Sequence, residues 1–164
     1  MDKKRGKQSF LLPNRPVITH WASIAGKKEG EGPLAPSFDI AFPDSHFGQP
    51  TWEQGEKRLQ QLALETLIGK AGIGPDQIDT VCSGDLLNQC IGSSFSLRNM
   101  GIPHLGLYGA FLIHSVLIQC FLTQRRIKHR LLFVLLVLMM NRLMLLRVHQ
   151  RRLLFFILVI CLLV

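Results

Sequence analysis

The C-terminal part of the chain lacks five residue types. Residues 111–164 contain no glycine, proline, alanine, aspartate or glutamate. All 11 acidic residues and 11 of the 19 basic ones precede residue 111, so this segment alone supplies the formal net charge of +8. A basic protein surface that binds nucleic-acid phosphates normally belongs to a domain with an element that enters a groove of the nucleic acid. No such motif is present in this sequence. The basic balance therefore does not predict nucleic-acid binding.

The cysteines lack the spacing of a redox motif or a zinc site. Cys82, Cys90, Cys120 and Cys161 form neither a CxxC pair nor a Cys/His zinc pattern, which favours buried, reduced thiols and predicts no metal site. A secretory signal is also absent, because the apolar segment 10–12 ends at a proline and is shorter than the ~7 to 15 apolar residues of such a signal. We therefore expect a cytoplasmic protein.

The segment 30–35 matches the glycine spacing of a dinucleotide-binding loop but lacks its context. Such a loop opens a helix whose N-terminus holds the pyrophosphate, whereas Pro33 and Pro36 favour extended or turn conformations. We predict no nucleotide and no other cofactor.

Residues 16–110, after a basic leader at 1–15, alternate between strand-like and helical patterns. Short loops between these elements imply parallel pairing, so we predict an α/β fold in the order strand, helix, strand, helix, strand. The expected elements are a strand at 17–25, an irregular connection at 26–50, a helix at 51–71, a strand at 78–83, a helix at 93–100 and a strand at 104–108.

The first of these helices has the most specific signature. Thr51 can cap its N-terminus, and Gln54 stands at the third helical position, where it can close a capping box. Gly72 supplies a stop, with Ile73 placed to pack back against the helix. The expected buried stripe consists of Leu59, Leu62, Ala63, Leu67 and Ala71.

Polar residues follow the second predicted strand. In parallel sheets, ligands bind beyond the carboxyl ends of the strands. Asp85, Asn88 and Gln89 lie there and can orient a small ligand. The same residues can instead cap the next helix and satisfy amides of the loop, and the sequence leaves both roles open.

A nucleophile, a base and an orienting acid can be assembled from Cys90, His104 and Asp85. Nothing in their spacing requires this arrangement. A core thiol, a histidine at a strand entry and a turn carboxylate are each the commoner role, so we disfavour a catalytic triad here.

Six groups of residues occur in the same order in a known family. They are Gly6-Lys7-Gln8, residues 28–34 with Phe38-Asp39, Trp52-Glu53, Lys70-Ala71-Gly72 with Ile78-Asp79, residues 84–89, and Gly101-Ile102-Pro103 leading into 106–110. Through these segments the chain resembles the stage V sporulation protein AD family of spore-forming bacteria, in the thiolase and ketoacyl-synthase superfamily. The resemblance covers residues 1–110 only.

The resemblance implies a thiolase-like fold with two similar α/β halves, of which this chain holds an incomplete N-terminal portion. It implies a homodimer in intact relatives. It also implies binding of dipicolinic acid for uptake into the developing spore, with Asp85, Asn88 and Gln89 matching the family motif as ligand-binding residues.

The resemblance breaks at Phe111. The family continues Gly109-Ala110 with a Cys-Ser-Thr run whose cysteine corresponds to the superfamily nucleophile, whereas this chain continues with Phe111-Leu112-Ile113. Phenylalanine cannot act as a nucleophile. We therefore expect a truncated, inactive relative rather than an enzyme, with a thiolase-type acyltransferase as the disfavoured alternative.

Residues 111–164 form a tail with 16 leucines, seven arginines and one lysine. Leucine, methionine and arginine favour helices, so we predict a helical tail. No apolar run reaches the ~20 residues of a spanning helix. In one interpretation, basic clusters flank helices that attach the protein to an anionic membrane surface. In the favoured one, the reading frame is shifted, because the composition and the family motif change together at Phe111.

Overall fold

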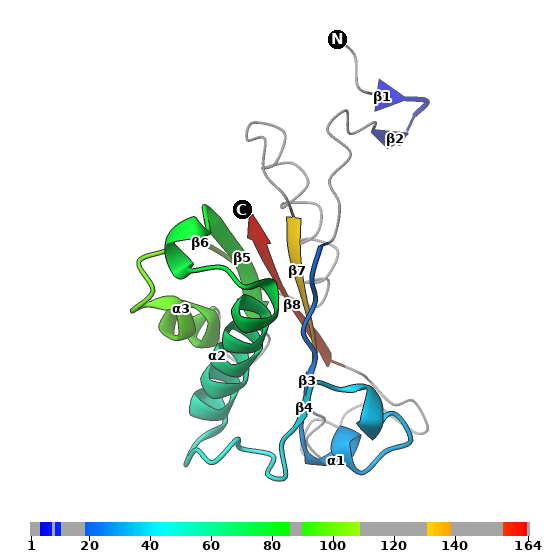
Figure 1. Cartoon of the computed structure of the whole chain (residues 1–164), viewed down its shortest axis with the longest axis vertical. Helices are drawn as coiled ribbons and strands as arrows, with labels where there is room; N and C mark the ends of the chain where they lie inside the picture. The colour runs from blue at the N-terminus through cyan, green and yellow to red at the C-terminus, as the bar shows by residue number, and fades with distance from the viewer. Residues whose placement is uncertain are drawn as a thin grey trace.

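The largest sheet has four strands in the order β6-β5-β8-β7 (Figure 1). The computed structural model describes residues 4–7, 9–10, 19–85, 90–108, 131–138 and 156–163. β5 (Thr80–Asp85) and β6 (His104–Tyr108) are parallel. β8 (Phe156–Leu163) is antiparallel to β5 and to β7 (Leu131–Leu138). The predicted α/β class and the parallel pairing of the strands at 80–85 and 104–108 are confirmed.

The first strand pairs differently from the prediction. Among residues 19–25, only β3 (Ile24–Ala25) is a strand, and it is parallel to β4 (Ile40–Ala41) instead of joining β5. One edge of β5 is occupied by β6 and the other by β8, so no edge is left for β3. The remaining short elements are β1 (Lys4–Arg5) antiparallel to β2 (Ser9–Phe10), helix α1 (Lys27–Gly30), and the 3-10 turns η1 (Ala35–Ser37) and η2 (Pro75–Gln77).

Helix α2 (Trp52–Ala71) begins and ends where the sequence predicts. The Oγ1 of Thr51 accepts a hydrogen bond from the Gln54 N–H at 3.3 Å. Gly72 adopts a left-handed conformation, with φ of 66°, and its N–H donates to the Ile68 carbonyl at 3.0 Å. Ile73 packs against the core, as predicted.

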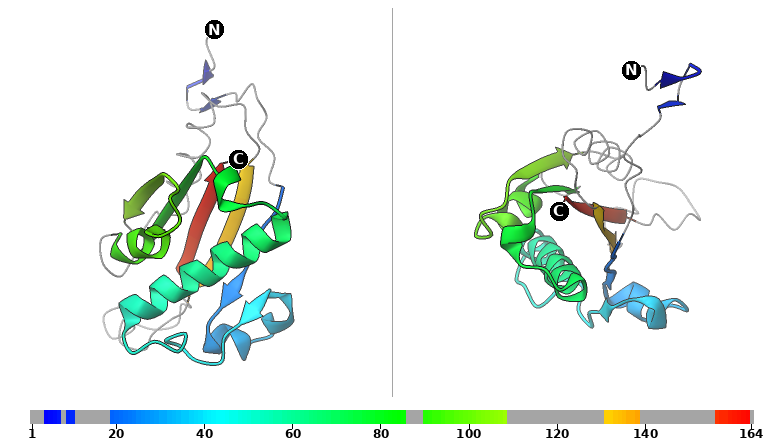
Figure 2. Two further views of the ribbon diagram at one scale, coloured as in Figure 1. Left: turned by 60° about the vertical axis from the view of Figure 1, so that its left-hand side comes forward. Right: turned by 45° about the horizontal axis from the view of Figure 1, so that its top comes forward.

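The buried face of α2 is wider than the predicted stripe. Leu59, Ala63 and Leu67 are buried as expected, whereas Leu62 and Ala71 are only partly buried. Leu64 and Gln60 are buried as well. The reason is tertiary, because α2 packs on both the strands and helix α3 (Ile91–Leu97), which lie around it in Figure 2.

The core is one apolar cluster between helices α2 and α3 and strands β3 and β5. Each fully buried leucine or valine stabilises the fold by ~1.5–3 kcal/mol. The cluster consists of Ala22, Ile24, Phe47, Leu59, Ala63, Leu64, Leu67, Ile78, Val81 and Leu97.

The boundaries of two predicted elements shift by a few residues. β5 begins and ends two residues later than predicted, and α3 begins two residues earlier than the predicted 93 and ends before the predicted 100. β6 has its predicted limits.

The prediction of a helical tail is wrong for the two tail segments that the structure describes. Residues 131–138 and 156–163 are strands β7 and β8, paired with each other along their whole length. Valine, isoleucine and phenylalanine favour strands, and pairing with β5 and between the two segments outweighs the helix propensity of leucine. Within the described residues, none of the helices has the length and hydropathy needed to cross a bilayer.

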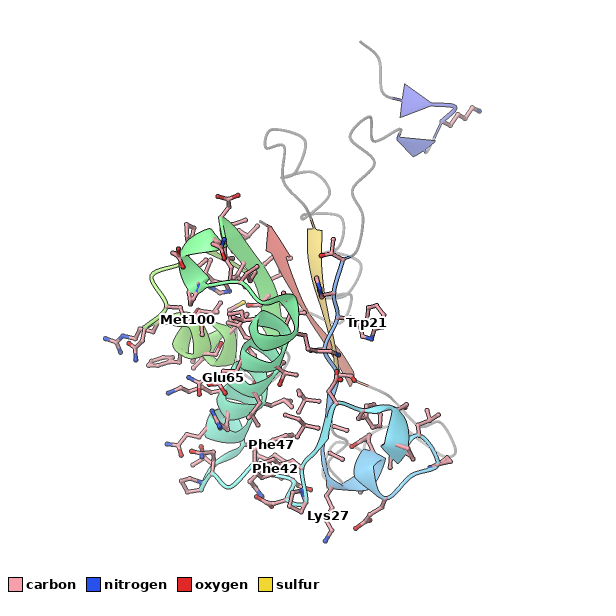
Figure 3. The ribbon with its side chains drawn as sticks, viewed as in Figure 1. Trp21, Lys27, Phe42, Phe47, Glu65 and Met100 are labelled. Carbon is pink, nitrogen blue, oxygen red and sulfur yellow. The ribbon has the colours of Figure 1, made fainter. Side chains whose placement is uncertain are left out.

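An ion pair joins the end of α2 to the connection before it. Lys70 Nζ lies 2.8 Å from Asp39 Oδ1, and the Ser23 N–H donates to Asp39 Oδ2 at 2.8 Å. Burial on its own raises the pKa of Asp39, but the hydrogen bonds from Lys70 and Ser23 outweigh it and hold the pKa below its usual value. The exposed ring of Trp21 lies 5.9 Å from the Lys70 ammonium and extends away from the helices (Figure 3).

The start of α2 touches the backbone of the preceding loop. A Cβ atom on Gly55 would stand 2.8 Å from the His46 carbonyl oxygen, closer than real Cβ contacts. The His46 ring also lies 3.9 Å from the Trp52 ring, centroid to centroid, and Phe42 contacts the buried Phe47 (Figure 3). Glycine at position 55 therefore lets the loop pack against the helix.

We expect opposite effects from alanine at two glycines of α2. Gly55→Ala should destabilise the fold by ~1–3 kcal/mol, because the added methyl group meets the His46 carbonyl. Gly69→Ala is the matched control, since a Cβ there meets nothing within 4 Å. It should stabilise the helix by up to ~1 kcal/mol. Urea unfolding of the two variants and the parent measures both effects, and equal midpoints for the two variants would contradict the close contact at Gly55.

Candidate functional site

The predicted ligand site lies where β5 and β6 end together. In the parallel register, Asp85 is the partner of Tyr108, and each is the last residue of its strand. This edge is the carboxyl end of both strands, as the sequence predicts. The side chain of Asp85, and all of Asn88, Gln89 and Phe111, lie outside the described residues, so their assignment stays a prediction.

A partly buried hydrogen bond links Ser83 of β5 to His104, the first residue of β6. Ser83 Oγ lies 2.8 Å from His104 Nε2, and Ser83 has no exposed surface. Ser83 is level with Gly106 in the register, so the bond crosses diagonally from one strand to the other. Ser83 is the last residue of the strand that the sequence predicts at 78–83, but it is not among the predicted ligand residues, although a serine within a buried strand needs a polar partner.

Gly106 leaves room for two side chains with reactive groups. The position that a Cβ on Gly106 would take lies 3.3 Å from Cys90 Sγ and 3.3 Å from His104 Cε1. Cys90 reaches this position from the start of α3, and His104 from the start of β6. A side chain at position 106 would therefore crowd both the thiol and the imidazole.

Cys90 has an unusual backbone for its residue type. Its φ is 68°, in the left-handed region that favours glycine. The Cys90 carbonyl accepts hydrogen bonds from the Ser94 N–H at 3.0 Å and from Ser93 Oγ at 3.1 Å. These bonds fix the first turn of α3.

A polar contact fixes α3 against α2. Ser96 Oγ lies 3.1 Å from Gln60 Oε1 and 2.7 Å from the Ser93 carbonyl oxygen, and Gln60 is buried. A hydroxyl has one proton and donates only once. With the Gln60 amide rotated by half a turn, Nε2 donates to Ser96 Oγ while Ser96 donates to Ser93, which satisfies the otherwise unpartnered Nε2.

Two residues of the disfavoured triad lie near Gly106. Cys90 Sγ and His104 Cε1 are each 3.3 Å from the position of a Cβ on Gly106, whereas the side chain of Asp85 lies outside the described residues. Ser83 is a hydrogen-bond partner of the histidine ring. The expected burial of thiols is confirmed for Cys82, whereas Cys90 is half-buried, and both are reduced. Among the described side chains, no group of three or more histidines, cysteines, aspartates or glutamates is placed to hold a metal ion.

Comparison with known proteins supports the resemblance noted from the sequence. The profile of the family described as Stage V sporulation protein AD matches residues 6–134. The match thus extends past Ala110, into residues that the sequence assigned to a foreign tail.

A curated relative gives the same result. Stage V sporulation protein AD of Bacillus subtilis (strain 168) is 33% identical over 108 residues, which cover 66% of this chain and 32% of the relative. The chain therefore spans about a third of that relative's length. Since the family profile covers most of the sequence, this chain belongs to the stage V sporulation protein AD family.

Proposed function

We propose that this chain is a ligand-binding, non-enzymatic family member that carries the N-terminal share of a site for dipicolinic acid. The observation that supports it is the common carboxyl edge of β5 and β6, where Asp85 is the last residue of β5, three and four residues before Asn88 and Gln89 in the sequence. Parallel strands that end together are where α/β proteins hold small ligands. The functional setting is uptake of dipicolinic acid into the developing spore.

The three polar residues have different expected roles towards an aromatic dicarboxylate. The amide groups of Asn88 and Gln89 can donate hydrogen bonds to its carboxylate oxygens. The Asp85 carboxylate would repel an anion at short range. Its expected role is therefore to accept hydrogen bonds from the turn and so to orient the two amides.

We propose further that the chain alone does not bind this ligand tightly. Phe111 replaces the cysteine expected at the start of the next helix, and the chain spans only 32% of its curated relative. Ligand sites enclose most of the surface of a small ligand, and a partial wall does not. Acyl transfer is disfavoured for the same reason, because phenylalanine offers no nucleophile.

A chimera tests the site. Residues 1–110 of this chain, joined to the matching remainder of the Bacillus subtilis relative, should bind dipicolinate in equilibrium dialysis, whereas the chain itself should show no saturable binding. Asn88→Ala with Gln89→Ala should weaken binding by the chimera ~10-fold or more, as expected for lost hydrogen bonds to a charged group.

The control in the chimera is Asp76→Asn, in η2 and away from the edge of β5 and β6. It should leave the dissociation constant unchanged. Unaltered binding by the double variant would remove the turn from the site, and saturable binding by the chain alone would refute its inactivity.

We also propose a homodimer through the outer edge of β6. β6 is the last strand of its sheet in the described structure, and exposed strand edges pair readily with another chain. Leu105 of β6 is 38% exposed, and Ile91 and Phe95 of the neighbouring helix α3 are 41% and 49% exposed. Exposed apolar side chains next to a strand edge suit a second copy of the same chain.

Light scattering after gel filtration tests the homodimer. Phe95→Glu and Leu105→Lys should each shift the chain to the monomer, because each places a charge in the apolar contact. Leu34→Lys is the matched control, since Leu34 is 62% exposed in a different part of the surface. A parent that is monomeric at high concentration, or a Leu34→Lys variant that dissociates equally, would contradict the proposal.

For the tail we propose a shifted reading frame that begins at Phe111. The loss of five residue types from Phe111 onward supports it, although the family match extends to residue 134. The alternative of helices lying on a membrane surface is weakened at 131–138 and 156–163, which are strands.

Nucleotide sequence downstream of codon 110 decides the question of the reading frame. We expect another frame to resume with a Cys-Ser-Thr run and to continue into a second α/β half. If no frame does so, the tail is genuine and the proposal fails.

A further inference from the structure

A thiol and an imidazole both lie close to Gly106. Cys90 Sγ and His104 Cε1 each lie 3.3 Å from the position of a Cβ at residue 106. They come from different elements, Cys90 from the start of α3 and His104 from the start of β6. The fold, and not the local sequence, therefore brings the two groups together.

The imidazole is held in a defined orientation. His104 Nε2 lies 2.8 Å from Ser83 Oγ, and Ser83 is fully buried, so the serine cannot exchange this contact for water without local opening. A base that a third group orients beside a thiol is the arrangement that activates cysteine nucleophiles. An adjacent histidine also favours the thiolate, which is the reactive form.

The two described thiols differ in access. Cys82 is 1% exposed within β5, whereas Cys90 is half-buried and caps the start of α3. Cys90 also has a φ of 68°, and such conformations in residues other than glycine are concentrated at functional sites. Access and backbone conformation both single out Cys90.

We propose that Cys90 is a thiol-modification site that reacts with small disulfides, with His104 as the neighbouring base and Ser83 as a positioning residue. The Cys90 thiol gives its proton to the imidazole, and its sulfur attacks one sulfur of the disulfide. The disulfide bond breaks, a mixed disulfide forms on Cys90, and the departing thiolate takes the proton back from the imidazolium. The small disulfide is the oxidant and is reduced to one thiol.

The first test compares the folded and unfolded states of the same full chain. Ellman's reagent, an aromatic disulfide, is added, and the labelling rate of each cysteine is followed by mass spectrometry of its peptides. An activated Cys90 reacts faster in the folded chain than in urea, and Cys82 reacts more slowly when folded. A Cys90 that is slower in the folded chain than in urea would overturn the proposal, because it would then be only a partly shielded thiol.

The second test uses variants of the pair. His104→Asn should slow the labelling of Cys90 ~10-fold and leave that of Cys82 unchanged. Ser83→Ala should slow Cys90 as well, and Ser83→Thr, which keeps the hydroxyl, should restore the rate. Thr66→Ala is the control, because it removes a hydrogen bond to the Leu62 carbonyl elsewhere on α2.

A variant that has unfolded is recognised by rapid labelling of its Cys82. In that case the comparison of Cys90 labelling in the folded and the unfolded parent chain tests the proposal. If folded His104→Asn and Ser83→Ala variants label Cys90 at the parent rate, the imidazole has no part in its reactivity and the proposal is wrong.

Discussion

The apolar cluster between α2, β3 and β5 is the constraint on which the rest of the described structure depends. Leu59, Leu64 and Leu67 of α2 are buried in it together with Val81 of β5. Because α2 also packs against α3, the cluster fixes α3 and its N-cap residue Cys90 relative to the strands. The carboxyl edge of β5 and β6 is therefore held by packing that lies well away from it.

Two glycines allow segments of the chain to approach each other closely. Gly55 lets the loop at His46 approach α2, and Gly106 leaves space that the side chains of Cys90 and His104 approach. In both places the missing side chain brings together segments that are distant in sequence. The contact at Gly55 supports the core. The contact at Gly106 places a thiol near an imidazole, which packing of the core alone does not require.

Family membership and the geometry bear on the same strand edge. The shared carboxyl edge of β5 and β6 carries Asp85, the first of the predicted ligand residues, and the chain spans 32% of its curated relative. Under the proposed function, the other walls of the site belong to the part of the family that this chain does not span, and a partial wall encloses a small ligand poorly. The Cys90 and His104 pair lies within the described residues.

The sequence by itself determined the limits of α2, the position of β6 and the family, because caps and stop signals act over three or four residues and the family motifs are short. Only the tertiary structure decided that β8 and not β3 lies beside β5, that Gln60 is buried, and that Ser83, Cys90 and His104 meet near Gly106. Sheet neighbours and close approaches join residues far apart in the chain, so no local pattern encodes them. The prediction of a helical tail was wrong for the same reason, since strand pairing outweighed the helix propensity of residues 131–138 and 156–163.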